Sequence, residues 1–214
     1  MGDKLQRNHI LLGPQGSGKG TQAKLMAAKY NIPHISTGDI FRELRTQDSA
    51  MGKKVRELID NGNLVPDEIT NQIVADRLAK PDCDEGFILD GYPRNIVQAQ
   101  FLEQKKPVNK CIYVEVSDAE SIKRITARRA CSVCKADFNT IYIKPKKEGV
   151  CDKCNGKLMQ RDDDTPEAVK KRLEIYYKET KPLLDFYKKK NALFKVNGEQ
   201  PVDKVFKDIV AGLK

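Results

Sequence analysis

The feature of this sequence that most limits its fold is a glycine-rich loop directly after an apolar run. Residues 13–21 read Gly-Pro-Gln-Gly-Ser-Gly-Lys-Gly-Thr and follow the run that ends at Leu12. With few side chains in the way, consecutive backbone N–H groups can point inward at one anion. A strand before this loop and a helix from Lys19 onward complete the context of a phosphate-binding loop, because the helix adds its N-terminal amides and dipole. The sequence therefore predicts a nucleotide phosphate site rather than a merely structural turn.

The loop departs from the strict pattern at one position. A Ser or Thr that contacts Mg²⁺ is expected directly after the lysine, whereas here Gly20 stands there and Thr21 follows. A carboxylate near the loop is then the favoured anchor for the magnesium that accompanies a nucleotide. Asp90, at the predicted end of the third strand, is that candidate, acting through water.

Apolar runs of strand length alternate with longer helical patterns. The strand candidates are residues 9–12, 33–35, 87–89, 111–116 and 193–196. Their nearly continuous apolar character is typical of strands that are buried on both faces. The alternation predicts an α/β fold with a five-stranded parallel sheet wrapped by helices.

Several helix boundaries are also visible. Residues 117–120 have the spacing of a capping box and predict a helix through Arg129. Thr165 and Pro166 predict an N-cap followed by proline in the first helical position. From Val202, apolar residues recur at spacings of three and four, so an amphipathic helix should close the chain.

Two stretches interrupt the strand pattern. Residues 36–65 are polar and helical, and they end in the turn at 61–63. Residues 127–164 carry two C-x-x-C pairs and short β-like pieces such as Tyr142-Ile143. Because the strand pattern resumes after each stretch, we expect one core (1–35, 66–126 and 165–214) with two insertions.

Charge and hydropathy narrow the range of partners. No apolar run approaches the roughly 20 residues of a membrane span, and no apolar leader opens the sequence, so we expect no membrane partner and a cytoplasmic location. The net charge of +9 suits nucleic acid or phosphorylated small molecules. A nucleic-acid module is disfavoured, because residues 127–164 contain few aromatics and their basic side chains are offset by the acidic run 162–164. We expect no nucleic-acid partner.

Four cysteines have the spacing of a metal site. Cys131 and Cys134 are separated from Cys151 and Cys154 by sixteen residues. Without an export signal this pattern favours a metal over disulfides. Four thiolates would fill a tetrahedral shell and leave no position for water, which predicts structural zinc. Redox pairs and unligated thiols are the alternatives.

Six segments resemble the adenylate kinase family, in order and along nearly the whole chain. They are GPQGSGKGTQA (13–23), STGDIFR (36–42), GNLVPD (62–67), GFILDGYPR (86–94, with Gln98 beyond), RITARR (124–129) and RDDDTPEAVKKRL (161–173). A switch-type GTPase is excluded, since the chain has no Asp-x-x-Gly and no Asn-Lys-x-Asp. The resemblance implies a monomeric P-loop nucleoside-phosphate kinase with a helical AMP-binding insert (36–65) and a small zinc-containing β lid (127–164). The implied reaction is the reversible transfer of the terminal phosphoryl group of ATP to AMP, giving two ADP.

The resemblance also implies which residues bind the two nucleotides. The residues implied for ATP are Gly16, Ser17, Gly18, Lys19, Gly20, Thr21, Arg124, Arg128, Asp137, Phe138 and Gln200. Those implied for AMP are Thr37, Arg42, Asn63, Leu64, Val65, Gly91, Tyr92, Pro93, Arg94, Gln98, Arg161 and Arg172. The implied catalytic set is Lys19, Arg94, Arg128, Arg161 and Arg172, and the acidic pair Asp163 and Asp164 helps to hold the lid arginines. Gln15 and Lys135 depart from the family's usual proline and glycine and carry no assigned role.

This arrangement suits the reaction chemically. The attacking group is already a phosphate oxygen that needs no general base, so catalysis reduces to positioning and charge neutralisation. Guanidinium forks grip two oxygens at once, and lids that close over both substrates keep out the water that would hydrolyse ATP. A kinase for another monophosphate, such as UMP or CMP, is the alternative, because Thr37 and Gln98 favour adenine by resemblance only.

Overall fold

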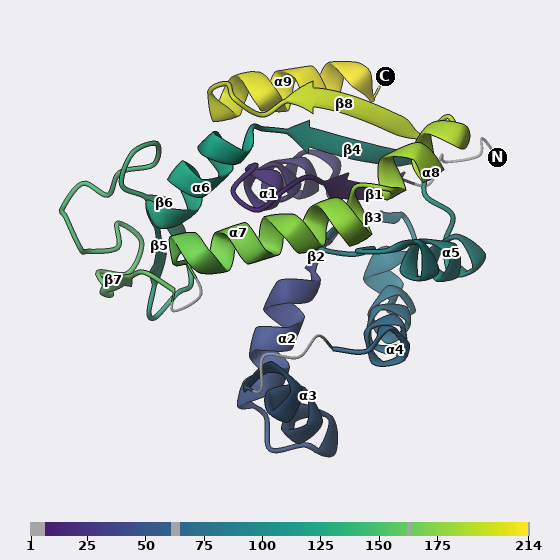
Figure 1. Cartoon of the computed structure of the whole chain (residues 1–214), viewed down its shortest axis with the longest axis horizontal. Coiled ribbons are helices and arrows are strands. Elements are labelled where there is room, and N and C mark those ends of the chain that lie inside the picture. Colours follow the sequence, from purple (N-terminus) through teal and green to yellow (C-terminus); the bar gives the residue numbers. More distant parts are fainter. Residues whose placement is uncertain (1–6, 61–64, 162–163, 214) are drawn as a thin grey trace.

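The computed structural model describes residues 7–60, 65–161 and 164–213. A five-stranded parallel sheet with the order β2-β3-β1-β4-β8 forms its centre (Figure 1). The strands are β1 (Arg7–Leu12), β2 (His34–Ser36), β3 (Gly86–Asp90), β4 (Lys110–Glu115) and β8 (Leu193–Asn197). The predicted parallel sheet is confirmed, with each strand within a residue or two of its predicted range.

The sheet is buried on both faces. Ile10 and Leu12 pack with α4 (Asp67–Leu78), α5 (Ile96–Lys105) and α8 (Leu183–Lys189). Leu11, between them, packs on the opposite face with α1 (Lys19–Tyr30) and α9 (Val202–Gly212). Side chains alternate along a strand, so an unbroken apolar run supplies both layers of core at once.

Both predicted N-caps are present. The Ser117 side chain accepts a hydrogen bond from Glu120 N at the start of α6 (Asp118–Thr126). Thr165 Oγ1 accepts one from Ala168 N at the start of α7 (Pro166–Ile175), which continues through the π-helical turn η2 (Tyr176–Thr180). Among the described residues, no helix is both long and apolar enough to cross a membrane.

The prediction that the helix at 118 continues through Arg129 is wrong. Helix α6 ends at Thr126, and Arg128 begins strand β5 (Arg128–Cys131). Arg128 pairs with Asn139 and Arg129 pairs with Phe138 in β6 (Asp137–Asn139). The backbone therefore leaves the helix to pair with a strand nine to eleven residues further along the chain. Such pairing is not visible in the local sequence.

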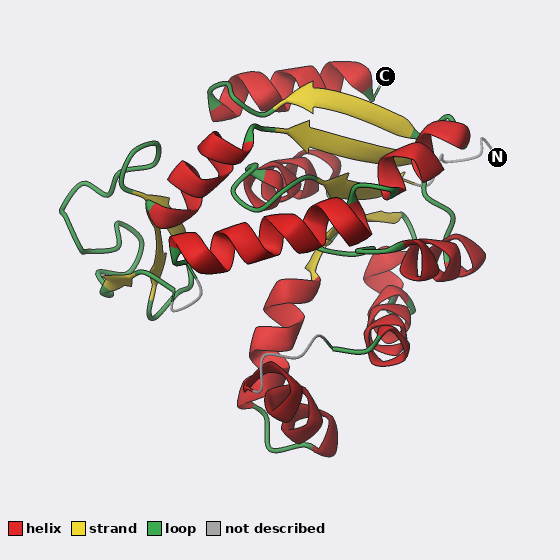
Figure 2. Ribbon diagram, in the orientation of Figure 1, coloured by secondary structure: helices red, strands yellow, loops and turns green. Residues whose placement is uncertain are grey.

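The first insertion consists of helices. Helix α2 (Thr37–Thr46) follows β2 directly, and α3 (Ala50–Asp60) packs against it. Figure 2 shows the two helices standing away from the sheet. The predicted turn at 61–63 lies outside the described residues. The chain returns to the core at α4, and a short 3-10 helix, η1 (Pro81–Cys83), precedes β3.

The second insertion contains a small antiparallel sheet of order β6-β5-β7, where β7 is Leu158–Met159. The β-like piece predicted at Tyr142-Ile143 is not a strand, although Ile143 forms an isolated bridge with Asn139. The Asn139 side-chain oxygen accepts hydrogen bonds from the N–H groups of Ile141 and Tyr142, at 2.9 and 3.1 Å. These bonds close a turn in place of a strand.

Candidate active site

The glycine-rich loop joins the carboxyl end of β1 to helix α1. Gly16 and Gly18 adopt φ values of 76° and 91°, which favour glycine. At Gly16 a Cβ atom would also lie 2.9 Å from the carbonyl oxygen of Ser121 on α6. Lys19 Nζ donates to the carbonyl of Pro14 at 3.2 Å, so the ammonium group lies folded back over the loop.

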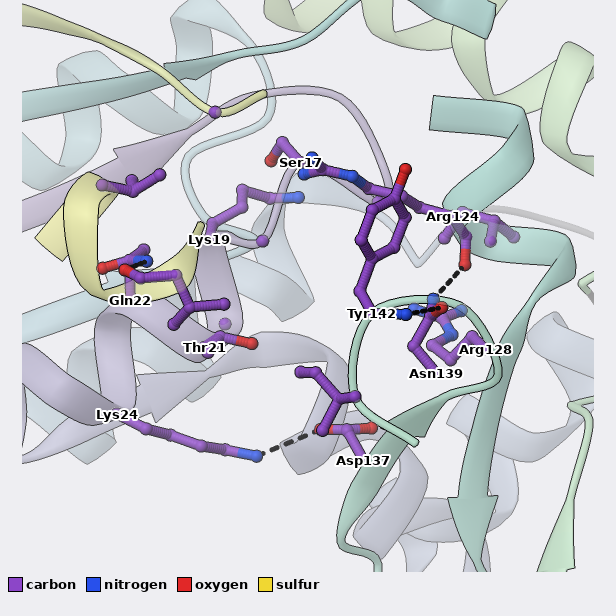
Figure 3. Close-up of a pocket in the computed structure, with 18 of the residues that line it drawn as sticks. Ser17, Lys19, Thr21, Gln22, Lys24, Arg124, Arg128, Asp137, Asn139 and Tyr142 are labelled. Carbon is purple, nitrogen blue, oxygen red and sulfur yellow. Dashed lines mark hydrogen bonds and ion pairs between the residues drawn. The ribbon is translucent and has the colours of Figure 1, made fainter. Parts of the chain in front are cut away.

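A cavity of about 970 Å³ opens above the loop (Figure 3). Its walls come from the loop, the end of β3, helix α2, helix α6, the small antiparallel sheet and the segment before α9. The predicted site residues that line it are Gly16, Ser17, Gly18, Lys19, Gly20, Thr21, Arg42, Asp90, Arg124, Arg128, Asp137, Phe138, Arg161 and Gln200. Ligand sites of parallel α/β sheets lie at the carboxyl ends of the strands, as this cavity does.

The carboxylate of Asp90 lies close to the loop residue Gly20. A Cβ atom at Gly20 would lie only 3.1 Å from Asp90 Oδ2, so glycine at this position leaves room for the carboxylate. Burial acts to raise the pKa of Asp90, but interaction with His34 and the charge of Lys19 hold it below its ordinary value. Burial lowers the pKa of Lys19, which Asp90 opposes. The carboxylate is therefore ionised at neutral pH and available to a cation.

Buried Asp164 organises two arginines of the site. Arg128 donates to both carboxylate oxygens, from Nε at 2.8 Å and from Nη2 at 2.5 Å. Arg172 Nη1 lies 3.7 Å from the same carboxylate. Burial, followed by repulsion from Arg128, lowers the pKa of both Arg161 and Arg172. The positive charge of these arginines thus exceeds the negative charge of the carboxylate beside them. Such an excess favours a polyanionic ligand.

A second group of implied residues lies around the loop after β3. Thr37 Oγ1 and Arg94 Nε both donate to the carbonyl oxygen of Gly91, at 2.9 and 2.8 Å. The backbone N–H of Arg94 donates to Gln98 Oε1 at 2.8 Å. These bonds link the start of α2 to the start of α5 at one edge of the sheet.

The structure does not bring every implied AMP residue to the cavity wall. Arg42 and Arg161 line it. The others that are described are not among its lining residues: Thr37, Val65, Gly91, Tyr92, Pro93, Arg94, Gln98 and Arg172. Asn63, Leu64 and Asp163 lie outside the described residues.

Sequence reasoning missed several residues of the cavity wall. The ring of Tyr142 lies under the guanidinium of Arg124, with 5.1 Å between the Arg124 Cζ and the ring centroid. Lys24 Nζ, on α1, donates to Asp137 Oδ2 at 3.1 Å, as Figure 3 shows. Lys24 follows Lys19 by five residues on the same helix, and this spacing is only a weak indication that it lines the cavity. Tyr142 carried no signal, because the turn that presents it is not visible in the sequence.

The four cysteines at 131, 134, 151 and 154 form one cluster. Their sulfur atoms all lie within 4.8 Å of one another, and the Cys131–Cys154 and Cys134–Cys151 pairs are separated by 3.4 and 3.6 Å. A tetrahedral metal with bonds of about 2.3 Å to sulfur places its ligands roughly 3.8 Å apart, so the cluster fits a metal ion.

The backbone around the cysteines is arranged in two similar turns. The N–H of Lys135 donates to the carbonyl of Cys131, and the N–H of Asn155 donates to that of Cys151. Both donors have a left-handed φ, 57° at Lys135 and 58° at Asn155. Lys135 therefore occupies a conformation in which glycine is less strained. The glycine that the family usually has at this position would relieve that strain.

Together, the parallel sheet, the loop at its central strand and the arginine-lined cavity define a P-loop nucleoside-phosphate kinase. A family model described as adenylate kinase matches residues 11–192. The chain belongs to the adenylate kinase family, whose reaction is phosphoryl transfer from ATP to AMP.

The sequences of individual relatives are similar to this chain over nearly their whole length. The chain is 51% identical over 209 residues to an adenylate kinase of Caldanaerobacter subterraneus, spanning 95% of both proteins. It is 49% identical to the adenylate kinase of Thermosipho africanus, over 95% of this chain and 97% of the relative. It is 48% identical to the adenylate kinase of Archaeoglobus fulgidus, over 97% and 98% respectively.

Proposed function

We propose that this chain transfers the terminal phosphoryl group of ATP to AMP with the residues described above. ATP phosphates would bind the loop amides of residues 16–21 and Lys19. The adenine of ATP would lie by Arg124, Asp137, Phe138 and Gln200, which line the same cavity. The observation that carries this proposal is the convergence of loop, lysine and arginines on one cavity large enough for two nucleotides.

AMP would enter from the side of helix α2. Arg42 and Arg161 would meet its phosphate from the cavity wall. Thr37, residues 63–65, residues 91–94 and Gln98 would hold the rest of the molecule. Arg94, Arg128, Arg161 and Arg172 would neutralise the charge that moves between the two phosphates, with Lys19 on the ATP side.

Mg²⁺ would enter with ATP, as is general for kinases, and would neutralise phosphate charge when bound. The residue proposed to hold it, through water, is Asp90. The ionised state of its carboxylate and its position beside Gly20 support this assignment.

The cysteine cluster is proposed to bind zinc. Its four thiol groups leave no open position, so the ion would hold residues 127–164 together and take no part in the chemistry. Metal analysis of the purified protein tests this. About one zinc per chain is expected, and a protein purified without chelators that contains no bound metal would contradict it.

The proposed division is a core of residues 1–35, 66–126 and 165–214, an AMP-binding insert at 36–65 and a lid at 127–164. Closure of both insertions over the nucleotides would exclude water from the site. We further propose a cytoplasmic monomer, and the six cysteines, none of which forms a disulfide, support the reducing compartment. Light scattering during size-exclusion chromatography would measure the oligomeric state.

The central test replaces Lys19 and keeps a matched control. Lys19→Met should lower the turnover of AMP by about a thousandfold or more, because one preorganised charge in such a site contributes several kcal/mol. Lys29→Met, in the exposed last turn of the same helix, should leave turnover unchanged. Retained activity in Lys19→Met would refute its role, and a coupled assay with UMP or CMP in place of AMP would reveal another substrate preference.

A further inference from the structure

The side-chain amide of Gln98 is fixed in a single orientation. Nε2 donates to Asp67 Oδ1 at 2.7 Å, and Oε1 accepts from the backbone N–H of Arg94 at 2.8 Å. A carboxylate cannot donate and a backbone N–H cannot accept, so the amide cannot be turned over without losing both bonds. Gln98 is only 4% exposed, so water cannot replace them.

Asp67 is itself held in place. It begins helix α4, and both of its carboxylate oxygens accept from Asn95 Nδ2 at 3.0 Å. Asn95 Oδ1 in turn accepts from the backbone N–H of Gln98, at 2.9 Å, as the N-cap of α5. Asp67, Asn95 and Gln98 therefore form a closed ring of hydrogen bonds between two helices.

The backbone of Gln98 is fixed from the other side. The hydroxyl of buried Tyr92 lies 3.2 Å from the Gln98 carbonyl oxygen and 2.7 Å from Asn71 Oδ1. Helix α4 thus supports Gln98 at two points, through Asn71 and through Asp67. Such closed networks specify one geometry.

We propose that Asp67 is a positioning residue that determines base specificity by fixing the Gln98 amide. This inference rests on the proposed function, in which Gln98 meets the base of AMP. One N–H and one oxygen lone pair of the amide remain free, in an order set by Asp67 and Arg94.

The fixed positions of the free N–H and the free oxygen lone pair of the Gln98 amide match adenine and do not match a 6-oxopurine. Adenine offers a donor at position 6 beside an acceptor ring nitrogen, which a glutamine amide can match with two bonds. Hypoxanthine and guanine carry an acceptor at position 6 and a donor at position 1, so the same amide would face oxygen with oxygen and N–H with N–H. A site whose buried polar groups would be left unpaired rejects such an analogue strongly.

The test compares AMP and IMP as phosphoryl acceptors. In Asp67→Ala both carboxylate oxygens are removed, so the amides of Asn95 and Gln98 lose their shared acceptor. The ratio of kcat/KM for AMP to that for IMP should fall about tenfold or more, and KM for AMP should rise while KM for ATP stays constant. Asp76→Ala is the matched control, because Asp76 on the same helix accepts a hydrogen bond from Gln72 at 2.7 Å and has no bond to Gln98.

A purely structural role predicts a different result. Loss of an acidic residue from the first turn of α4 would lower the melting temperature and leave the AMP to IMP ratio unchanged, and that outcome would overturn the proposal. Asn95→Ser, which keeps an N-cap oxygen and removes the bonds to Asp67, should lower the same ratio about threefold, and an unchanged ratio there would also overturn it. A wild-type protein that failed to phosphorylate AMP would refute the proposed function itself.

Discussion

The sheet and the small antiparallel sheet are held together by different means. On the two faces of the parallel sheet, buried aliphatic and aromatic side chains form two large clusters, with Phe87, Ile88 and Leu89 of β3 fully buried. The cluster of the small sheet contains only four buried residues, Cys131, Phe138, Cys151 and Leu158. Two of those four, Cys131 and Cys151, belong to the cluster of four cysteines.

This contrast indicates that the two regions are stabilised by different interactions. A core of about a hundred and more residues buries enough apolar surface to fold on its own, whereas a segment of a few tens of residues usually needs a cross-link or a metal. We therefore expect the core to respond to changes in packing, and the proposed lid, residues 127–164, to respond to removal of the proposed metal. The following experiments test that separation.

The largest effect is expected from the core. Phe87→Ala should lower the free energy of unfolding by about 4 kcal/mol, because it empties a fully buried site in β3. Urea denaturation would measure the loss. Val97→Ala, at an exposed position, is the control and should change stability by less than about 0.5 kcal/mol. An equally small loss for Phe87→Ala would show that the core does not depend on packing in this way.

Removal of the metal should act on the lid. Chelation should lower stability by about 3 kcal/mol, as expected for loss of a tightly bound ligand, and should speed hydrogen exchange in residues 127–164 before that of the sheet. The metal-free protein should still catalyse the reaction at low temperature. Loss of chemistry in a fully folded protein would contradict a purely structural role for the ion. Cys83→Ser, outside the cluster, should leave the metal content unchanged.

Acid should weaken the core through His9. Burial, aided by the positive charges of Arg7 and Lys110, lowers the pKa of His9 to about 4, and its Nδ1 has no hydrogen-bond partner among the described residues. Between pH 6.5 and 4 the unfolded chain binds the extra proton, so stability is full above pH 6.5 and falls as the pH drops. At pH 5 the loss should be about 2 kcal/mol relative to neutral pH.

The variant His9→Gln isolates this effect. Thermal unfolding of both proteins across this range should show a flatter pH dependence for His9→Gln. Parallel curves would mean that other groups cause the acid sensitivity.

The smallest effect is expected where the lid meets the core. Lys24 and Asp137 form an ion pair whose side chains are 55% and 41% exposed. Lys24→Met should change the free energy of unfolding by less than about 1 kcal/mol, and by still less in high salt, because exposed pairs contribute little. A larger, salt-independent loss would indicate that lid and core are one cooperative unit. Lys195→Met, which removes another surface pair with Glu115, is the control.

Much of the core could be predicted from the sequence because its signals are local. The apolar runs, the glycine loop and the caps at Ser117 and Thr165 each depend on neighbouring residues. Helix α6 ended three residues earlier than expected, because the pairing of Arg128 with Asn139 belongs to tertiary structure. Local propensity is overridden in this way wherever a distant strand competes.

In the candidate site, too, local features could be predicted from the sequence and long-range contacts could not. Single residues such as Lys19, Asp90 and the four cysteines could be selected by spacing. The partners that set their geometry could not, since Asp67 with Gln98 and Lys24 with Asp137 are joined across 31 and 113 residues of sequence. No local sequence pattern predicts a hydrogen bond between residues that lie so far apart in the sequence.

The contact between Gly16 and helix α6 has a consequence for movement. A methyl group on Gly16 would lie 2.9 Å from the Ser121 carbonyl, and Ser121 Oγ donates to the Gln15 carbonyl at 2.5 Å. The loop and α6 are in direct contact, so α6, which leads into residues 127–164, cannot slide towards the loop. If residues 127–164 close as the proposed lid, they have to turn about this contact, and a bulkier residue at position 16 would push α6 away from the loop.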